Sequence, residues 1–264
     1  MVSWPALGTR VTLRYRRPSG SVPPLTDAVG RLVAIDPTAR VQTKSGAIIE
    51  VAPADVVALR ILTDAPVRTA DIRALEQAAA AAWPGVEQTW KQGWLLRAQG
   101  ATQDANAAVP LDISAHLSTV PAIVAWYTDR GLTPRLAIPD RLLALPPGWQ
   151  PEHTEQVMVR DVEPREPDPS IIVFADGAHA FARHPAGSEV RAAVTEAPNG
   201  IGWVGLSSVP AHCAGLCNAL LAWGAGLGAT KAHLCLPDTD STALADSLGF
   251  RLHHRRRYVL PPSR

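Results

Sequence analysis

The feature that most constrains the fold of this sequence is an internal repeat. The segment GLTPRLAIPD (131–140) recurs in modified form as GATKAHLCLPD (228–238). Each copy is preceded by a helical pattern that contains an Ala-Trp pair and ends at a glycine, where helices commonly terminate. Each is followed by a second helical pattern ending in Gly-Trp or Gly-Phe and by a final strand pattern. Because these elements recur in the same order, the sequence predicts a duplicated α/β unit.

Composition narrows the class of protein and its partners. The chain has 264 residues, 47% of them hydrophobic, and no apolar run of the length that a membrane span requires. Its first residues, MVSWPALGTR, do not have the pattern of a secretion signal, so we expect a cytoplasmic protein without a membrane partner. A net charge of +1 gives no reason to expect nucleic acid as a partner. The three cysteines, an odd number, do not have the spacing of a disulfide framework. This is typical of a protein in a reducing compartment.

Residues 1–64 have the pattern of a small β-domain. Short β-branched runs are separated by turn pairs such as Ser19-Gly20 and Asp36-Pro37, and together they resemble an SH3-like β-barrel. Tyr15 lies among Arg14, Arg16 and Arg17, which either contact a phosphate, an acidic peptide or a protein partner, or form a solvated strand face. The expected strands are 9–16, 27–35, 40–46, 47–51 and 56–62, with a one-turn connection at 53–55.

The rest of the chain reads as two copies of the repeat joined by a proline- and acid-rich linker at 162–169. Before the linker we expect helices at 71–83, 119–130 and 141–149 and strands at 89–100, 132–138 and 154–162. After it we expect strands at 171–177, 179–184, 189–197, 202–209, 231–236 and 255–260, with helices at 216–227 and 241–250.

The second copy resembles the GNAT superfamily of N-acetyltransferases, which transfer acetyl from acetyl-CoA to an amine. The resemblance is carried by the strand WVGLSSV, a glycine-containing turn, the strand KAHLCL and the helix ending Leu248-Gly249-Phe250. It covers about 170–260, a weaker relic covers 66–162, and with the barrel the chain resembles a mycobacterial-type acetyltransferase. The resemblance implies an α+β fold: an SH3-like β-barrel (1–64), a degenerate GNAT-like α/β lobe (65–162) and a GNAT acetyltransferase lobe (163–264), with mixed sheets.

The resemblance also implies where acetyl-CoA binds. The family's Gln/Arg-x-x-Gly-x-Gly/Ala turn corresponds to His212–Cys217, where Gly215 lets the backbone approach a pyrophosphate at a helix N-terminus. The match is degraded, because His212 stands in the place of the cation and Cys217 in that of the small residue; the segment before Gly215 is also short. The pantetheine would lie along the preceding strand. The expected cofactor residues are Leu206, Ser207, Ser208, Val209, His212, Cys213, Ala214, Gly215, Leu216 and Cys217.

The catalytic residues that the family commonly uses are not all present. The tyrosine position on the last helix is Ala245, and the strand WVGLSSV carries no carboxylate. Amine acetylation usually needs a general base and a donor to the departing thiolate. Glu189 as base and Tyr258 as donor are therefore the candidates, although a surface group is the favoured interpretation of each.

Two further clusters have simpler explanations. Cys213 and Cys217, one helical turn apart, could be imagined around a zinc ion with His212, His233 and Cys235. The spacing matches no paired zinc signature, so we expect no metal. The basic run 253–257 could bind a phosphate or nucleic acid; on a strand its side chains alternate, and a charged, solvated edge strand is the favoured interpretation.

The residues and the resemblance together indicate an acetyl-CoA-dependent N-acetyltransferase. The first copy has no glycine-containing loop before its helix, so we expect that it lost cofactor binding and forms a wall of the acceptor cleft. The acceptor could be a protein lysine, a protein N-terminus or a small-molecule amine. The alternatives are a non-catalytic acetyl-CoA-binding protein and an adaptor built on the barrel.

Overall fold

The structure is a computed structural model that describes residues 4–5, 7–43, 45–62, 67–100, 104–166, 168–184, 187–207, 209–210, 212–240 and 242–262. The chain divides into two compact units, Met1–Pro66 and Val67–Arg264, which are described separately. No helix in these ranges has the length and apolar character needed to cross a membrane.

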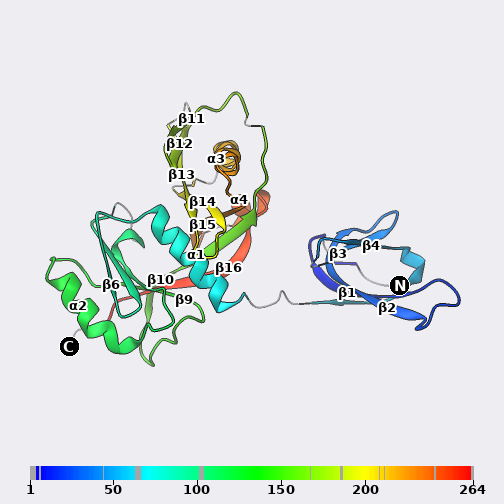
Figure 1. Ribbon diagram of the computed structural model, residues 1–264, viewed down its shortest axis with the longest axis horizontal. Helices are drawn as coiled ribbons and strands as arrows, with labels where there is room; N and C mark the ends of the chain where they lie inside the picture. The colour runs from blue at the N-terminus through cyan, green and yellow to red at the C-terminus, as the bar shows by residue number, and fades with distance from the viewer. Residues whose placement is uncertain are drawn as a thin grey trace. The chain divides into compact units, whose positions relative to one another are not determined.

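The N-terminal unit is a five-stranded antiparallel sheet in the order β4-β3-β2-β1-β5 (Figure 1). Each of the five expected strands is present, and a single turn of 3₁₀-helix at Pro53–Asp55 precedes the last one, as predicted. Alternate side chains, among them Leu13, Leu32 and Val41, are buried and form the core. The strands are β1 (Arg10–Arg16), β2 (Leu25–Ala34), β3 (Ala39–Thr43), β4 (Ile48–Val51) and β5 (Val56–Ile61).

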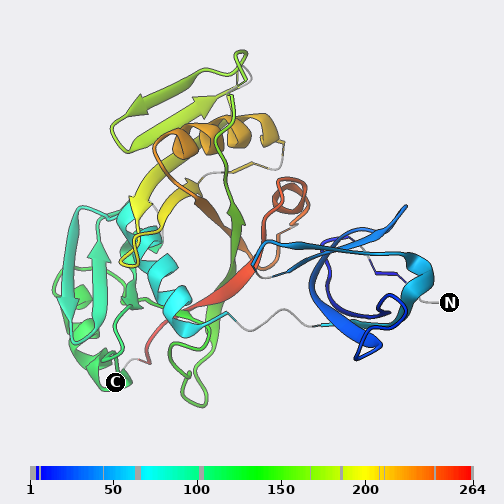
Figure 2. The same ribbon diagram turned by 45° about the vertical axis from the view of Figure 1, so that its right-hand side comes forward.

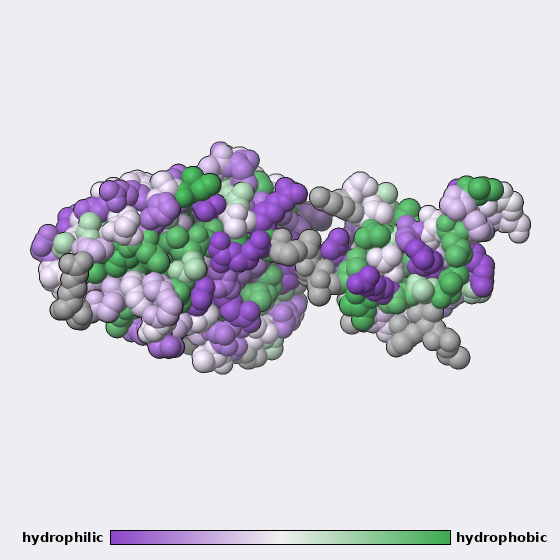
Figure 3. Space-filling model, turned by 90° about the horizontal axis from the view of Figure 1, so that it is seen from below, coloured by the Kyte–Doolittle hydropathy of each residue, from purple (hydrophilic) through white to green (hydrophobic). Residues whose placement is uncertain are grey.

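The surface of this unit carries both charged and apolar side chains. Arg14 forms an ion pair with Asp27 on the neighbouring strand, 2.8 Å from its Oδ1, as expected of a solvated strand face. Val57 and Ile61 on β5 are exposed, and Figure 3 shows hydrophobic residues interleaved with hydrophilic ones on the surface.

The second unit is built on one sheet of eleven strands in the order β11-β12-β13-β14-β15-β10-β16-β9-β8-β7-β6. The strands are β6 (Glu87–Lys91), β7 (Trp94–Ala98), β8 (Ala108–Pro110), β9 (Leu136–Pro139), β10 (Pro151–Asp161), β11 (Val173–Asp176), β12 (His179–Arg183), β13 (Glu189–Glu196), β14 (Gly202–Ser207), β15 (Lys231–Pro237) and β16 (Arg251–Val259). The helices are α1 (Thr69–Ala82), α2 (Val120–Thr128), α3 (Ala214–Gly226) and α4 (Ala243–Ser247), with 3₁₀ turns at Asp104–Asn106 and Leu117–Thr119.

The two halves of this sheet exchange their last strands. β10 ends the first copy but pairs with β15 of the second, whereas β16 ends the second copy and pairs with β9 of the first. β10 and β16 also pair with each other and lie side by side at the centre of the sheet (Figure 2). In both halves the strand that follows the long helix, β9 or β15, is parallel to the strand before that helix. The sheet therefore continues across the predicted lobe boundary at 162/163, and the division into two lobes stays a prediction.

The helices cover the two faces of the sheet unequally. α1 packs on one face, where Leu75 and Ala78 contact Val157 and Trp203. α3 and α4 pack on the opposite face of the second half, and α2 packs on the corresponding face of the first. Gly224 brings α3 close to β14, because a Cβ at this position would lie only 2.7 Å from the Cβ of Val204. This close contact packs the last turn of α3 against the middle of β14.

Two expected elements have a different structure. The helix expected at 141–149 is wrong: the segment forms turns, Arg141 has φ 67°, and its apolar side chains pack as loop anchors against the core under α2. Pro146 and Pro147 also prevent continued helical hydrogen bonding. The single strand expected at 89–100 is a hairpin of β6 and β7. Its turn is Gln92-Gly93, where both residues have positive φ, as tight hairpins require.

Candidate active site

The strands that would hold the cofactor separate at a defined position. β14 and β15 run parallel, with paired residues from Trp203–Lys231 to Leu206–Leu234. Beyond this point β15 continues to Pro237, where it pairs with β10, whereas β14 ends at Ser207. The backbone of β14 at Ser207 is thus no longer paired with β15. An extended ligand can use such a strand end as a hydrogen-bonding partner.

The N-terminus of α3 lies directly after this strand end in the chain. The helix begins at Ala214, with Cys213 as its N-cap. The amide of Cys213 donates to the carbonyl of Pro210, and that of Cys217 donates to the carbonyl of Cys213. Helix geometry then leaves the first-turn amides of Ala214, Gly215 and Leu216 without a partner inside the helix. Three of the four amides expected to bind the pyrophosphate are therefore suitably placed, and that of Cys217 is already engaged.

The side chains of the predicted turn lie in contrasting environments. His212 is exposed, and its Nε2 lies 3.1 Å from the hydroxyl of Ser188 at the start of β13. Cys213 and Cys217 are buried in the core beneath α3, where burial and the neighbouring Cys213 raise the pKa of Cys217 to about 12. Both thiols therefore act as small apolar core groups. In the part of the chain that the structure describes, no group of three or more potential metal ligands is found.

The remaining residues of the predicted cofactor strand are partly described. Leu206 is buried beneath α3 and Ser207 is half-buried at the end of β14. Val209 is half-buried and packs against the same core. Ser208 lies outside the described residues.

The two predicted catalytic side chains are not together. Glu189 opens β13, and Tyr258 lies on β16, with β14, β15 and β10 between them. Glu189 accepts hydrogen bonds from Arg183 (2.5 Å) and Arg191 (2.8 Å), and these bonds lower its pKa. Ala245, in the family's tyrosine position, is buried in the core under α4.

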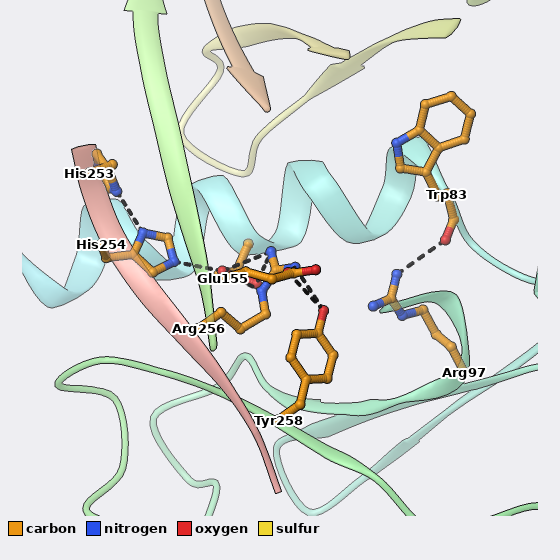
Figure 4. Close-up of polar contacts among 8 residues, drawn as sticks. Trp83, Arg97, Glu155, His253, His254, Arg256 and Tyr258 are labelled. Carbon is orange, nitrogen blue, oxygen red and sulfur yellow. Dashed lines mark hydrogen bonds and ion pairs between the residues drawn. The ribbon is translucent and has the colours of Figure 1, made fainter. Parts of the chain in front are cut away.

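Tyr258 belongs instead to a buried polar cluster that the sequence analysis missed. Figure 4 shows side chains of β16 that point toward α1. Glu76 of α1 is 2% exposed; its Oε1 lies 2.6 Å from Nε2 of His254 and 3.0 Å from Nη2 of Arg256. Burial alone would raise the pKa of Glu76, but Arg256 and His254 lower it to about 2. The carboxylate is therefore an anion held between two basic groups.

A second carboxylate, Glu155 of β10, extends the cluster toward β15. Its Oε2 accepts hydrogen bonds from the Tyr258 hydroxyl (3.1 Å) and from Nη1 of Arg256 (3.3 Å). Tyr258 stacks on His153, with ring centroids 4.2 Å apart. Glu155 faces Pro237 in the β10–β15 register, so it lies at the end of β15 that has separated from β14.

A β-bulge in β16 explains why two consecutive histidines meet in this cluster. Val157 faces His254 and Met158 faces Leu252, which leaves His253 as the extra residue. The Nδ1 atoms of His253 and His254 are consequently 2.8 Å apart. Burial and the proximity of His254 lower the pKa of His253 to about 4.

This geometry corrects the interpretation of the basic run 253–257. β16 is a central strand between β10 and β9, so the expected edge strand is wrong. The expected alternation fails at the bulge, and His254 and Arg256 are buried. The usable signal was the spacing of His254, Arg256 and Tyr258 at every second position, together with a carboxylate, Glu76, in the middle of an alanine-rich helix.

Comparisons with known proteins agree with the division of the chain. Residues 5–60 match the family profile "Rv0428c N-terminal Sm-like domain", and residues 69–175 and 172–259 match "Probable histone acetyltransferase Rv0428c C-terminal". The sequence is 57% identical over 292 aligned positions to the probable histone acetyltransferase Rv0428c of Mycobacterium tuberculosis, with 98% of this chain and 97% of the relative covered. The N-terminal profile is described as Sm-like, where the sequence analysis expected SH3-like.

Solved structures with low sequence identity were also found. A GCN5-related N-acetyltransferase from Kribbella flavida is 12% identical, with 76% of this chain and 98% of the other covered and a TM-score of 0.49. One from Sphaerobacter thermophilus is 12% identical, with coverages of 75% and 96% and a TM-score of 0.39. From the two profiles and the mycobacterial relative, the chain belongs to the Rv0428c family of probable histone acetyltransferases, with an Sm-like domain at its N-terminus.

Proposed function

We propose that this chain is an acetyl-CoA-dependent N-acetyltransferase. Membership of a family described as probable acetyltransferases supports the reaction class. The observation that carries the proposal is the end of the β14–β15 ladder at Leu206–Leu234, together with the start of α3 at Ala214. One site thus offers an unpaired strand end for an extended ligand and helix amides for an anion.

The residues present fit the cofactor in a specific order. The pantetheine would follow the backbone of Leu206–Val209, and the pyrophosphate would accept hydrogen bonds from the amides of Ala214, Gly215 and Leu216. When bound, acetyl-CoA supplies the thioester from which the acetyl group is transferred. The exposed His212 at the same helix start can add a further hydrogen bond to a phosphate oxygen.

For the acid–base chemistry we propose Glu155 and Tyr258 as a pair. Glu155 lies at the end of β15 that has separated from β14, and it accepts a hydrogen bond from the Tyr258 hydroxyl. A proton that leaves the acceptor amine can therefore reach a carboxylate–phenol pair. Backbone amides at the end of β14 can stabilise the developing oxyanion. The two arginines hold Glu189 as an anion, so we assign it to positioning the acceptor.

Family membership suggests classes of acceptor that can be tested. The Mycobacterium tuberculosis relative is named as a probable histone acetyltransferase, so a lysine in a basic protein is one candidate, beside protein N-termini and small amines. The N-terminal domain, whose SH3-like architecture is part of the proposal, would contribute protein contacts through its exposed strand faces.

The test is to incubate the full chain with acetyl-CoA and basic proteins, peptides or small amines, and to measure free CoA and acetylated product by mass spectrometry. We expect product formation for at least one class of acceptor. CoA binding in calorimetry without any product would favour the non-catalytic alternative. Absence of both binding and product would overturn the proposal.

A further inference from the structure

A hollow of about 420 Å³ lies on the sheet face opposite α3, beside the edge strand β11. Its walls include the aromatic side chains Trp83, Phe174, His179 and Phe181. Arg191, Arg183 and Glu189 line its other side. None of these residues except Glu189 has a place in the proposed chemistry.

The aromatic walls are held in fixed positions. Phe174 and Phe181 stack with ring centroids 4.9 Å apart and an interplanar angle of 15°. Trp83 meets His179 edge to face at 6.0 Å. Arg97 donates a hydrogen bond of 3.1 Å to the carbonyl of Trp83, which fixes the end of α1 (Figure 4). Phe174 nevertheless remains 49% exposed, so a flat apolar group can still cover it.

The strand register connects this hollow to the proposed site of acetyl transfer. Phe174 faces Phe181, Phe181 faces Arg191, and Arg191 faces Ser207 on successive strands. All four lie on the sheet face opposite α3, because their neighbours in each strand pack beneath α3. Adjacent strands are about 4.8 Å apart, so the backbones of Phe181 and Ser207 are separated by about 10 Å.

The charges along this row do not oppose an amine. Arg191 lies between the aromatic pair and Ser207, but the charges of Arg191 and Arg183 are balanced by Glu189, which is bonded to both, and by Asp176, which also lines the hollow. A ligand entering from this face also avoids the start of α3, where the pyrophosphate would bind. Acceptor and cofactor would thus reach Ser207 from opposite faces of the sheet.

We propose that this hollow binds an aryl group of the acceptor. The amine that is acetylated would lie about 10 Å, or two strand spacings, from that aryl group. The inference rests on the proposed acetyltransferase function and assigns part of its substrate. The aryl group can belong to a small arylalkylamine or to an aromatic residue near a lysine in a peptide. In both cases stacking on Phe174 supplies the affinity. The register of strands β11 to β14 sets the length of the chain between the aryl group and the amine.

The first test is a series of amine acceptors at saturating acetyl-CoA: benzylamine, 4-phenylbutylamine, 6-phenylhexylamine, whose extended chain spans about 10 Å, and n-hexylamine. A pair of lysine peptides that differ only in a nearby Phe or Ala extends the series. We expect kcat/KM to rise with the phenylalkyl spacer and to exceed that of n-hexylamine about tenfold, mainly through KM. A preference in the peptides alone would identify a peptide acceptor, and a preference in the amines alone would identify a small one; both support the inference.

The second test replaces Phe174 by Ala, with Ile172→Ala as the matched control. Both side chains are largely exposed, at 49% and 65%, and Ile172 does not line the hollow. Phe174→Ala should lower kcat/KM for the aryl acceptor roughly three- to tenfold, the range of an aromatic pair, and leave n-hexylamine unaffected. Ile172→Ala should change neither. Equal effects on aryl and alkyl acceptors would overturn the inference.

Binding measured without turnover separates this inference from the proposed function. Titration of 4-phenylbutylamine into the full chain should show binding that Phe174→Ala weakens and Ile172→Ala does not. If such binding is found but no acetyl is transferred, the aryl-binding role of the hollow is supported and the proposed enzyme activity is contradicted. If acetyl is transferred without a preference for aryl acceptors, the proposed enzyme activity is supported and the aryl-binding role of the hollow is contradicted.

Discussion

The two halves of the eleven-stranded sheet share a topology but differ at the start of their long helices. In the second half, β14 and β15 pair over four residues before they separate, and α3 begins with Ala214-Gly215. In the first half, β8 and β9 pair only at Ala108–Leu136, and α2 begins with Val120-Pro121 after a 3₁₀ turn. Proline has no amide hydrogen, so Pro121 removes one of the donors that an anion would need.

Because of this difference, the proposed cofactor site is placed in only one of two halves that share a topology. Both halves place a helix after a strand in the same order, but only the second combines a longer parallel ladder with a glycine in the first helical turn. The halves depend on each other for stability, because β10 and β16 exchange partners and α1 connects to them through Glu76. Substitutions can therefore test the cofactor difference and the shared centre separately.

The largest effect is expected at the shared centre. Glu76→Gln removes the nearer carboxylate of the buried Arg256, which keeps only the longer contact with Glu155, and should lower the free energy of unfolding by about 3–5 kcal/mol. Urea denaturation monitored by circular dichroism measures the change. The control is Glu196→Gln on an exposed position at the end of β13, which should change stability by less than about 0.5 kcal/mol. Equal stability of the two variants would show that the cluster does not hold α1 on the sheet.

The next effect separates the two helix starts. Gly215→Glu places a negative side chain at the proposed phosphate site and should weaken CoA binding about a hundredfold, since like charges near a protein surface repel by several kcal/mol. A Cβ at Gly215 would meet only the end of the Ile171 side chain, at 3.1 Å, so the variant should fold.

Two controls place the same charge elsewhere. Pro121→Glu puts it on the exposed first turn of α2, and Gly226→Glu puts it at the open far end of α3. Neither should change CoA affinity in calorimetric titration. If Pro121→Glu weakens binding as much as Gly215→Glu does, the cofactor is not confined to the second half.

The sequence predicted the local elements well and their pairing poorly. The strands of the N-terminal unit, α1 and α3 follow from periodicity and from stop signals such as Pro84, which act over a few residues. The strand exchange and the contact of Glu76 with His254, 178 residues apart, depend on tertiary packing that periodicity does not encode. The bulge at His253 was hidden for the same reason, because one extra residue in a strand leaves no compositional signature.

A smaller effect tests the close packing that places α3. Gly224→Ala would bring a Cβ within 2.7 Å of the Cβ of Val204, so α3 must move away from β14 at a cost of about 1–3 kcal/mol. Gly226→Ala, two residues further along the same helix, has no atom within 4 Å and should be neutral or stabilising by up to about 1 kcal/mol. Thermal unfolding distinguishes the two. A further loss of CoA affinity only in Gly224→Ala would connect this packing to the cofactor site.

The smallest effect is a pH dependence at the bulge. Burial and the nearby groups His254, Arg251 and Lys231 lower the pKa of His253 from 6.5 to about 4, against the opposing influence of Glu76. Between these two pH values the unfolded chain binds a proton that the folded chain does not, so stability falls as the pH decreases from 6.5 to 4. His253 is partly exposed, and we expect a loss of about 1 kcal/mol between pH 7 and pH 5, measured by urea denaturation. His253→Gln should reduce this loss, and an unchanged pH profile in the variant would contradict the assignment.

Glu76 should add a separate loss of stability only at lower pH, because its carboxylate is protonated between about pH 4.5 and pH 2.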